Sequence, residues 1–147
     1  MALLSAGCAS TPQGILFRPV QDAPAGVALI YVYRPDDGKG TEFEVACNGT
    51  IIGTLPKAGY IPIFMPPGKV EFVASVKFKL FQTGALDPAF AGSSECVFTA
   101  EAGKTYYVEG IADEAEGQRL RLAPAASRYA LLRIANCRLQ PQEKNIK

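Results

Sequence analysis

The sequence predicts a mainly β protein, a single antiparallel β-sandwich with one short C-terminal helix. Three observations predict this fold class: short segments rich in β-branched and aromatic residues, turn residues that separate them, and one late segment with helical spacing. The chain has 147 residues, of which 48% are hydrophobic, so it can bury the core of one domain. We expect that domain over residues 27–140.

Eight segments have the composition of strands. Residues 27–34 are dense in β-branched and aromatic side chains and end before a proline, as a buried central strand should. Residues 42–47 alternate, so Phe43, Val45 and Cys47 share one face. The expected strands are 27–34, 42–47, 51–55, 60–65, 70–78, 96–100, 106–111 and 118–123.

Two turn motifs join strands in the first half of the chain. Asn48-Gly49 is a strong hairpin signal, because both residues accept a positive φ and a type I′ turn matches the twist of strands. Pro66-Pro67-Gly68 predicts a second turn. We expect the strands on either side of it, 60–65 and 70–78, to pair as a hairpin.

The segment from Ser127 to Asn136 differs from the rest, because its apolar residues recur at helical spacing. We predict a short helix, with Ser127 capping its start and Asn136 taking the left-handed conformation at its end. A strand is the alternative, because Tyr129 and Leu131 could also alternate in one. The polar residues 141–147 are expected to form a frayed tail.

Residues 1–7 form an apolar run that ends in small residues directly before Cys8. A secretory signal needs a basic start and an apolar stretch of roughly 7 to 15 residues, and both are short here, so we interpret residues 1–7 as a signal-peptide remnant. The run Leu4-Ser5-Ala6-Gly7-Cys8 resembles the lipobox of bacterial lipoproteins. This resemblance implies that Cys8 becomes the first residue of the mature chain and carries the lipid. The alternative is a leader with an incidental cysteine.

A lipid on Cys8 would hold the protein at a membrane without a spanning helix, because burying acyl chains contributes about 0.8 kcal/mol per methylene. No later segment of the sequence reaches the roughly 18 apolar residues that a spanning helix needs. The lipobox resemblance also implies outer-membrane sorting, since Ala9 stands where aspartate is linked to retention in the inner membrane. We therefore expect the protein at the bacterial outer membrane, facing the periplasm.

Residues 8–26 are rich in Pro, Gly, Ser, Thr and Ala and are predicted to form a flexible tether. Its apolar side chains could adhere to the domain rather than float. These are Ile15, Leu16, Phe17 and Val20.

Four motifs resemble one protein family when they are taken in order. They are residues 28–35, Asn48-Gly49 with Ile52-Gly53, Pro66-Pro67-Gly68-Lys69, and residues 102–108. They look like bacterial lipoproteins and secreted proteins that share a PEGA-like β-sandwich, the domain-of-unknown-function family numbered 2846. The resemblance covers residues 27 to about 117 and implies a fold without a known activity.

If Cys8 carries a lipid, three cysteines remain in an oxidising compartment, so at most one intramolecular disulfide can form. We favour a bridge between Cys96 and Cys137, which would fasten the helix to the sheet. Cys47 would then be a small buried hydrophobe. The alternative is that all three are buried and free.

Composition argues against several classes of function. The net charge of +1 provides no strong field for nucleic acid, and the chain has no histidine, the commonest general base and metal ligand. No two cysteines stand two to four residues apart, and the acidic turns at 36–37 and 113–116 lack the ordered ligands of a calcium loop. We therefore expect no catalytic residue, cofactor or metal. An envelope enzyme with an unrecognised carboxylate or cysteine site is the alternative.

Two surface features are candidates for binding. The connection 78–94 is long, and its Leu86 and Phe90 could form a partner-binding loop for an envelope protein or polymer, or else pack on the sandwich edge. Five arginines in the C-terminal third could touch an anionic polymer or lipid headgroup, although exposed, solvating arginines are the more ordinary explanation. They are Arg119, Arg121, Arg128, Arg133 and Arg138. The sequence thus predicts a membrane-anchored, non-enzymatic binding or structural module.

Overall fold

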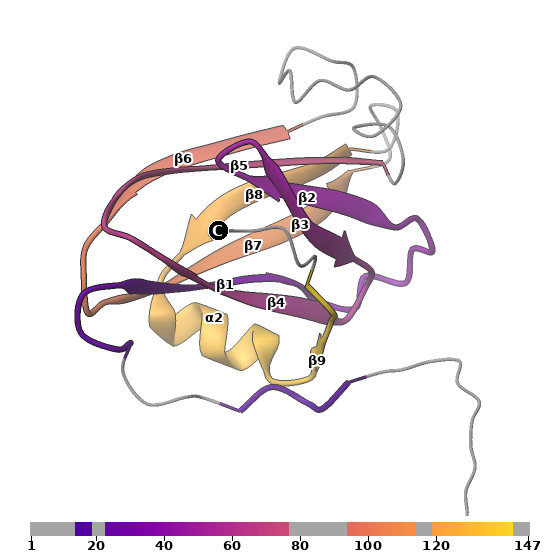
Figure 1. The fold of residues 1–147 in the computed structure, drawn as a ribbon. Helices are drawn as coiled ribbons and strands as arrows, with labels where there is room; N and C mark the ends of the chain where they lie inside the picture. Colours follow the sequence, from indigo (N-terminus) through magenta and orange to yellow (C-terminus); the bar gives the residue numbers. More distant parts are fainter. Residues whose placement is uncertain (1–13, 19–22, 77–93, 114–118, 143–147) are drawn as a thin grey trace, which may run out of the picture.

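The computed structural model, which describes residues 14–18, 23–76, 94–113 and 119–142, is a mainly β protein with one short helix (Figure 1). Two packed sheets form a sandwich, and the helix covers the outer face of one of them, which confirms the predicted fold class. The elements are β1 (Ala28–Arg34), β2 (Phe43–Cys47), β3 (Thr50–Leu55), β4 (Gly59–Met65), β5 (Gly68–Val76), β6 (Ser94–Ala100), β7 (Thr105–Asp113), β8 (Arg119–Ala125), α2 (Ser127–Ile134) and β9 (Arg138–Leu139).

The five-stranded sheet has the order β8-β7-β1-β4-β9, and the four-stranded sheet has the order β3-β2-β5-β6. All pairings in the four-stranded sheet are antiparallel, as expected. The five-stranded sheet is mixed, because β1 pairs with β7, and β4 with β9, in parallel. In its centre, Val32 lies between Ile61 and Val108.

The hairpin expected around Pro66-Pro67-Gly68 is not formed. Strand β4 pairs with β1, whereas β5 pairs with β2 and β6, so the chain changes sheets at this turn. The physical reason is burial, because the apolar residues of β4 and of β5 face each other across the core between the two sheets instead of lying side by side in one sheet. The Asn48-Gly49 hairpin is confirmed, with φ values of 47° and 88°.

Two hydrophobic clusters bury the five-stranded sheet on both faces. The main core fills the space between the sheets and includes Phe43, Val45 and Cys47, which confirms their predicted common face. The second cluster lies on the other face, beneath α2, and is built around Tyr31 and Tyr60. Every residue of β1 is buried as a result.

The helix begins and ends differently from the prediction. Ala126, not Ser127, is the N-cap residue, and no side chain caps the helix. Ala135 at the other end is right-handed, and Asn136 has no positive φ. The short chain reversal is closed instead by the Cys137 amide, which donates to the Ile134 carbonyl at 2.8 Å.

Two parts of the predicted tether are described, residues 14–18 and 23–26, and residues 14–18 are docked on the domain beside β9 (Figure 1). The Leu139 amide donates to the Ile15 carbonyl at 3.0 Å, and the Phe17 amide donates to the Cys137 carbonyl at 2.8 Å. The Phe17 ring is buried and contacts Tyr31 and Tyr60 edge to face. The folded domain therefore includes this segment, while Val20 lies outside the described residues.

The end of the described chain is also held. The Gln140 amide donates to the Tyr60 carbonyl at 2.9 Å, and the Gln142 amide nitrogen Nε2 donates to the Pro62 carbonyl. Residues 141 and 142 of the expected frayed tail thus lie against the domain. Residues 143–147 lie outside the described residues.

Candidate functional site

The structure describes only some of the residues that the sequence analysis singled out. Cys8 and the loop residues Leu86 and Phe90 lie outside the described residues. Cys96 and Cys137 are described, but the fold does not bring them together. Cys96 faces the core between the sheets, and Cys137 belongs to the cluster on the opposite face of the five-stranded sheet.

The predicted disulfide between Cys96 and Cys137 is therefore absent, and Cys47, Cys96 and Cys137 are all free and buried. A Cys47–Cys96 bridge is excluded by register, because both residues lie opposite Phe72 on its two neighbouring strands. Two strand spacings amount to about 10 Å, and a disulfide needs Cα atoms within about 7 Å. The three thiols are instead buried and free, which was the alternative that the sequence left open.

These thiols have little nucleophilic character. Burial raises the pKa of Cys47 to about 12, that of Cys96 to about 11 and that of Cys137 to about 12. A thiol in such a site stays protonated at neutral pH, and the thiolate is the reactive form. The three cysteines are therefore packed as small apolar residues of the hydrophobic core.

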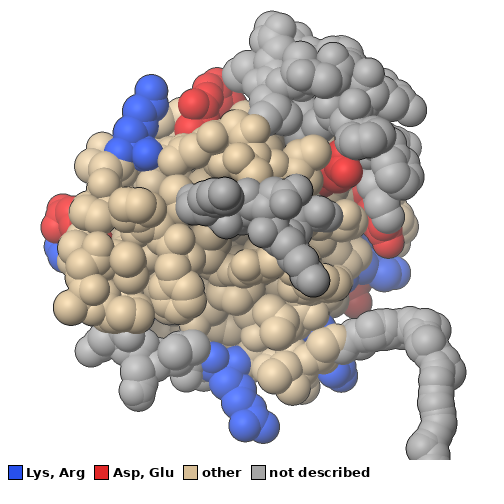
Figure 2. Space-filling view, in the orientation of Figure 1, with Lys and Arg blue, Asp and Glu red and all other residues tan. Residues whose placement is uncertain are grey.

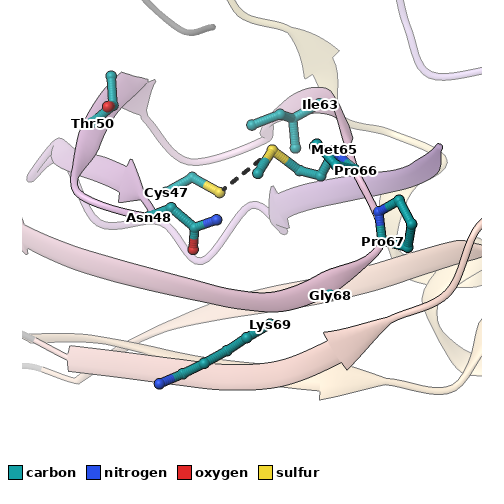
Figure 3. Close-up of a pocket in the computed structure, with 9 residues that line it drawn as sticks. All are labelled: Cys47, Asn48, Thr50, Ile63, Met65, Pro66, Pro67, Gly68 and Lys69. Carbon is teal, nitrogen blue, oxygen red and sulfur yellow. Dashed lines mark hydrogen bonds between the residues drawn. The ribbon is translucent and has the colours of Figure 1, made fainter.

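One pocket opens where the chain changes sheets (Figure 3). Its volume is about 290 Å³. Figure 3 shows Cys47 Sγ and Met65 Sδ pointing toward each other, 4.0 Å apart, while Lys69 extends away from them. The lining residues are Cys47, Asn48, Thr50, Ile63, Met65, Pro66, Pro67, Gly68 and Lys69.

The chemistry of this pocket is that of a shallow, mixed surface. It has two soft sulfur atoms but no carboxylate or activated hydroxyl among its lining residues. Among the residues that the structure describes, no group of three His, Cys, Asp or Glu side chains could hold a metal ion. The pocket can admit a small group, and the charged side chain of its lining is Lys69, which extends away from the two sulfur atoms.

A buried ionic cluster lies between β1, β7 and α2, and the sequence analysis missed it. The Glu109 carboxylate accepts hydrogen bonds from the Tyr33 hydroxyl at 3.3 Å and from Arg133 Nε at 2.7 Å. Burial, and then the charge of Glu109, raise the pKa of Tyr33 far above its usual value. Both Glu109 oxygens are occupied, so the cluster fastens α2 to the sheet. The feature of the sequence that could have predicted this cluster is a glutamate within a strand that is buried on both faces.

Arg34 is a second buried charge that the sequence analysis did not single out. Its Nε and Nη2 donate to the two carboxylate oxygens of Asp37, at 2.8 and 3.1 Å. Its guanidinium also lies 5.1 Å from the centre of the Phe43 ring. Its other bonds go to the carbonyls of Lys39, Thr41 and Leu55. These contacts hold the loop 37–41 against the end of β1 and, through Leu55, join β1 to β3. They use every N–H of the guanidinium, so none is left to donate to a ligand.

The outer side of α2 is the most unusual surface of the described molecule. Only Ala130 and Ile134 of the helix are buried. Three large apolar residues are exposed next to arginines: Leu132 at 79%, Tyr129 at 49% and Leu131 at 38%. Within the described residues, no helix is both long and apolar enough to cross a membrane. We call the exposed residues Arg128, Tyr129, Leu131, Leu132 and Arg133 the α2 face.

Comparison with known proteins adds no family. The chain matches no protein-family model, and it matches no curated protein.

Proposed function

We propose that the protein is a membrane-anchored lipoprotein of the bacterial envelope, a non-enzymatic β-sandwich module that binds a partner or has a structural role. The observation that carries the proposal is the run Leu4-Ser5-Ala6-Gly7-Cys8, in which small residues precede a cysteine. The lipid would sit on Cys8. The proposed location is the outer membrane, facing the periplasm, because Ala9 follows that cysteine. The proposed family is the PEGA-like one numbered 2846.

The docked segment is consistent with such an anchor. Six peptide steps separate Cys8 from Gly14, the first described residue (14 − 8 = 6). An extended chain spans at most about 3.3–3.6 Å per residue, so the Cα atoms of these two residues are at most about 22 Å apart. A lipid on Cys8 would hold the folded domain close to the bilayer surface.

The buried polar groups favour a non-enzymatic module over the alternative envelope enzyme. A cysteine enzyme needs a thiolate, and burial raises the pKa of Cys47, Cys96 and Cys137 well above neutral pH. A carboxylate enzyme needs an acid that faces substrate, and the buried Glu109 is taken up by Tyr33 and Arg133. The partner would be an envelope protein or polymer, with Leu86 and Phe90 as its proposed contacts.

The anchor is tested on the native gene product. Its N-terminal peptide is analysed by mass spectrometry after membrane fractionation, beside a Cys8→Ser variant and a Cys96→Ser control. We expect an acylated Cys8 peptide and outer-membrane recovery for the native chain and for Cys96→Ser, with both lost in Cys8→Ser. An unmodified Cys8 in a soluble product would refute the anchor.

The partner loop is tested separately, by crosslinking in intact envelopes. A Leu86→Ser, Phe90→Ser double variant should lose the crosslinked partner. The matched control is a Phe64→Ser, Val97→Ser double variant, which changes two exposed apolar residues elsewhere. Loss of the crosslink in both double variants, or in neither, would contradict a role for this loop.

A further inference from the structure

The two leucines of the α2 face lie on the side of the helix that points away from the sheet. Arg128, Leu131, Leu132 and Ala135 are all exposed and follow the i, i+3, i+4, i+7 spacing of a single stripe. In a helix that packs on a sheet, the side turned to water is normally polar. In α2, two leucines occupy the centre of the exposed side. This side therefore has the composition of a surface that is buried against a partner.

Arginines predominate around the α2 face, where the nearby acids are Glu109, which pairs with Arg133, and Asp36, whose charge acts on Cys137. Residues 119–142 contain five arginines and no Asp or Glu. Arg128 makes no ion pair within the part of the chain that the structure describes, and Arg133 keeps 43% of its side chain exposed beside Glu109. The charged side chains at the lower edge of Figure 2, where α2 and residues 14–18 lie, are Lys or Arg. This surface is complementary to an anionic one.

The opposite side of the molecule carries the acids. The outer face of the four-stranded sheet holds Glu44, Glu71 and Glu95, because their strand neighbours face the core, and these three carboxylates outnumber the one lysine that the structure describes on that face, Lys69. Glu95 lies close enough to Glu71 for the pKa of Glu95 to be raised, first by the hydrogen bond that its protonated carboxyl donates to the Glu71 carboxylate. A charged plane would thus attract one side of the domain and repel the other.

The proposed anchor enters from the side of α2. Phe17 shares one buried cluster with Ala130 and Ile134 of the helix, so the docked segment and α2 belong to the same layer. Because Cys8 is at most about 22 Å from Gly14, a lipid there brings this layer, rather than the acidic sheet, to the bilayer.

Building on the proposed anchor at Cys8, we propose that the α2 face docks on the anionic phospholipid surface that holds the lipid. Leu131 and Leu132 enter the interfacial region, and Arg128 contacts the phosphate groups. The domain is then held in one orientation, with the glutamates of the four-stranded sheet turned away from the membrane.

The test places one tryptophan on each side of the domain, because the chain has none of its own. The full chain is coupled through the Cys8 thiol to maleimide-bearing lipid in vesicles of phosphatidylethanolamine and brominated phosphatidylglycerol. Coupling favours Cys8 because Cys47, Cys96 and Cys137 are buried. Leu132→Trp reports on the α2 face, and Val97→Trp, at an exposed position of β6, is the matched control.

We expect the indole of Leu132→Trp to shift to the blue and be quenched by bromine, and that of Val97→Trp to stay in water. Adding Arg128→Gln should lower the ratio of docked to undocked chain about fivefold, the contribution of one arginine near an anionic surface. Lys69→Gln, on the other sheet, should leave the ratio unchanged.

Equal quenching at both positions, no quenching at Leu132→Trp, or equal docking on phosphatidylcholine would overturn the proposal. A blue shift of Leu132→Trp that grows with protein concentration before vesicles are added would show that a second copy covers the face. Chemical coupling does not depend on acylation in the cell. Failure of the anchor and failure of the docking are therefore distinguished.

Discussion

Replacing Arg34 by alanine should lower the free energy of unfolding by about 4 kcal/mol. The two bonds to Asp37 are charge-assisted, and at about 1.5 kcal/mol each they contribute about 3 kcal/mol. The bond to the buried Leu55 carbonyl adds about 1 kcal/mol, because that acceptor would be left unsatisfied. The Lys39 and Thr41 carbonyls lie in a partly exposed loop, where water can replace the guanidinium.

The assay is equilibrium unfolding in urea, followed by far-ultraviolet circular dichroism. With a dependence of about 2 kcal/mol per molar urea, the midpoint should fall by about 2 M in Arg34→Ala. The urea midpoint of Arg34→Lys should lie between those of the native chain and Arg34→Ala, since an ammonium keeps the charge but cannot reproduce the planar fork of the guanidinium. Arg121→Ala, at an exposed position of β8, is the control and should change stability by less than about 0.5 kcal/mol. A loss below about 1 kcal/mol in Arg34→Ala would show that these bonds do not hold β1 to β3.

Four further results are expected. Burial raises the pKa of Asp37, but hydrogen bonds from Arg34 and the Lys39 amide outweigh it and hold the pKa below its usual value. The native chain should therefore be more stable than Asp37→Asn, and the full difference should be present above the ordinary carboxyl pKa. It should disappear as the pH falls through the lowered pKa of Asp37. Urea midpoints of the two proteins that stay equally far apart in acid would contradict this. In a Cys8→Ser chain, iodoacetamide should label no thiol in the native state and three after unfolding, as read by mass; a native adduct on Cys96 would show that its burial is misassigned. Ala58 has a φ of 58°, so Ala58→Gly should stabilise the fold by about 0.5–1 kcal/mol, whereas Ala46→Gly inside β2 should destabilise it in the same urea assay. A Cβ on Gly14 would overlap the Leu139 carbonyl oxygen, so Gly14→Ala should release the docked segment and speed chymotryptic cleavage after Phe17, whose ring is buried in the native fold, while Gly40→Ala, which has open space, should not.

The features that could be predicted from the sequence depend on neighbouring residues. The alternation of Phe43, Val45 and Cys47 follows from the two-residue period of a strand, and the Asn48-Gly49 turn follows from the φ values that those residues accept. The helix over Ser127–Ile134 was likewise visible in its spacing. Its caps were not, because the chain enters it directly from β8, with Ala126 extended.

The features that could not be predicted depend on which sheet a strand joins. Residues around Pro66-Pro67 have the composition of a hairpin turn, and local propensity cannot show that β4 and β5 belong to different sheets. The same choice separates Cys96 from Cys137, since a bridge between them would have to cross the five-stranded sheet. The sequence indicates only that Arg34 is the polar residue at the end of a strand. Four of its five hydrogen bonds appear only once the loop 37–41 folds back around the guanidinium, and the fifth needs Leu55 of β3 beside it.

The distribution of charge shows how far composition and fold can differ. A net charge of +1 predicts no strong electrostatic field over the whole protein, but this prediction rests on the sum of the charges and not on their positions. The fold separates the contributions, because the glutamates of β2, β5 and β6 face away from the core on one sheet, while the acid-free stretch 119–142 supplies the edge and cover of the other. A nearly neutral chain therefore forms a domain with an acidic and a basic side. Near a charged membrane the orienting force depends on this separation rather than on the sum, so the position of α2 beside the docked residues 14–18 matters more to its behaviour there than the total charge does.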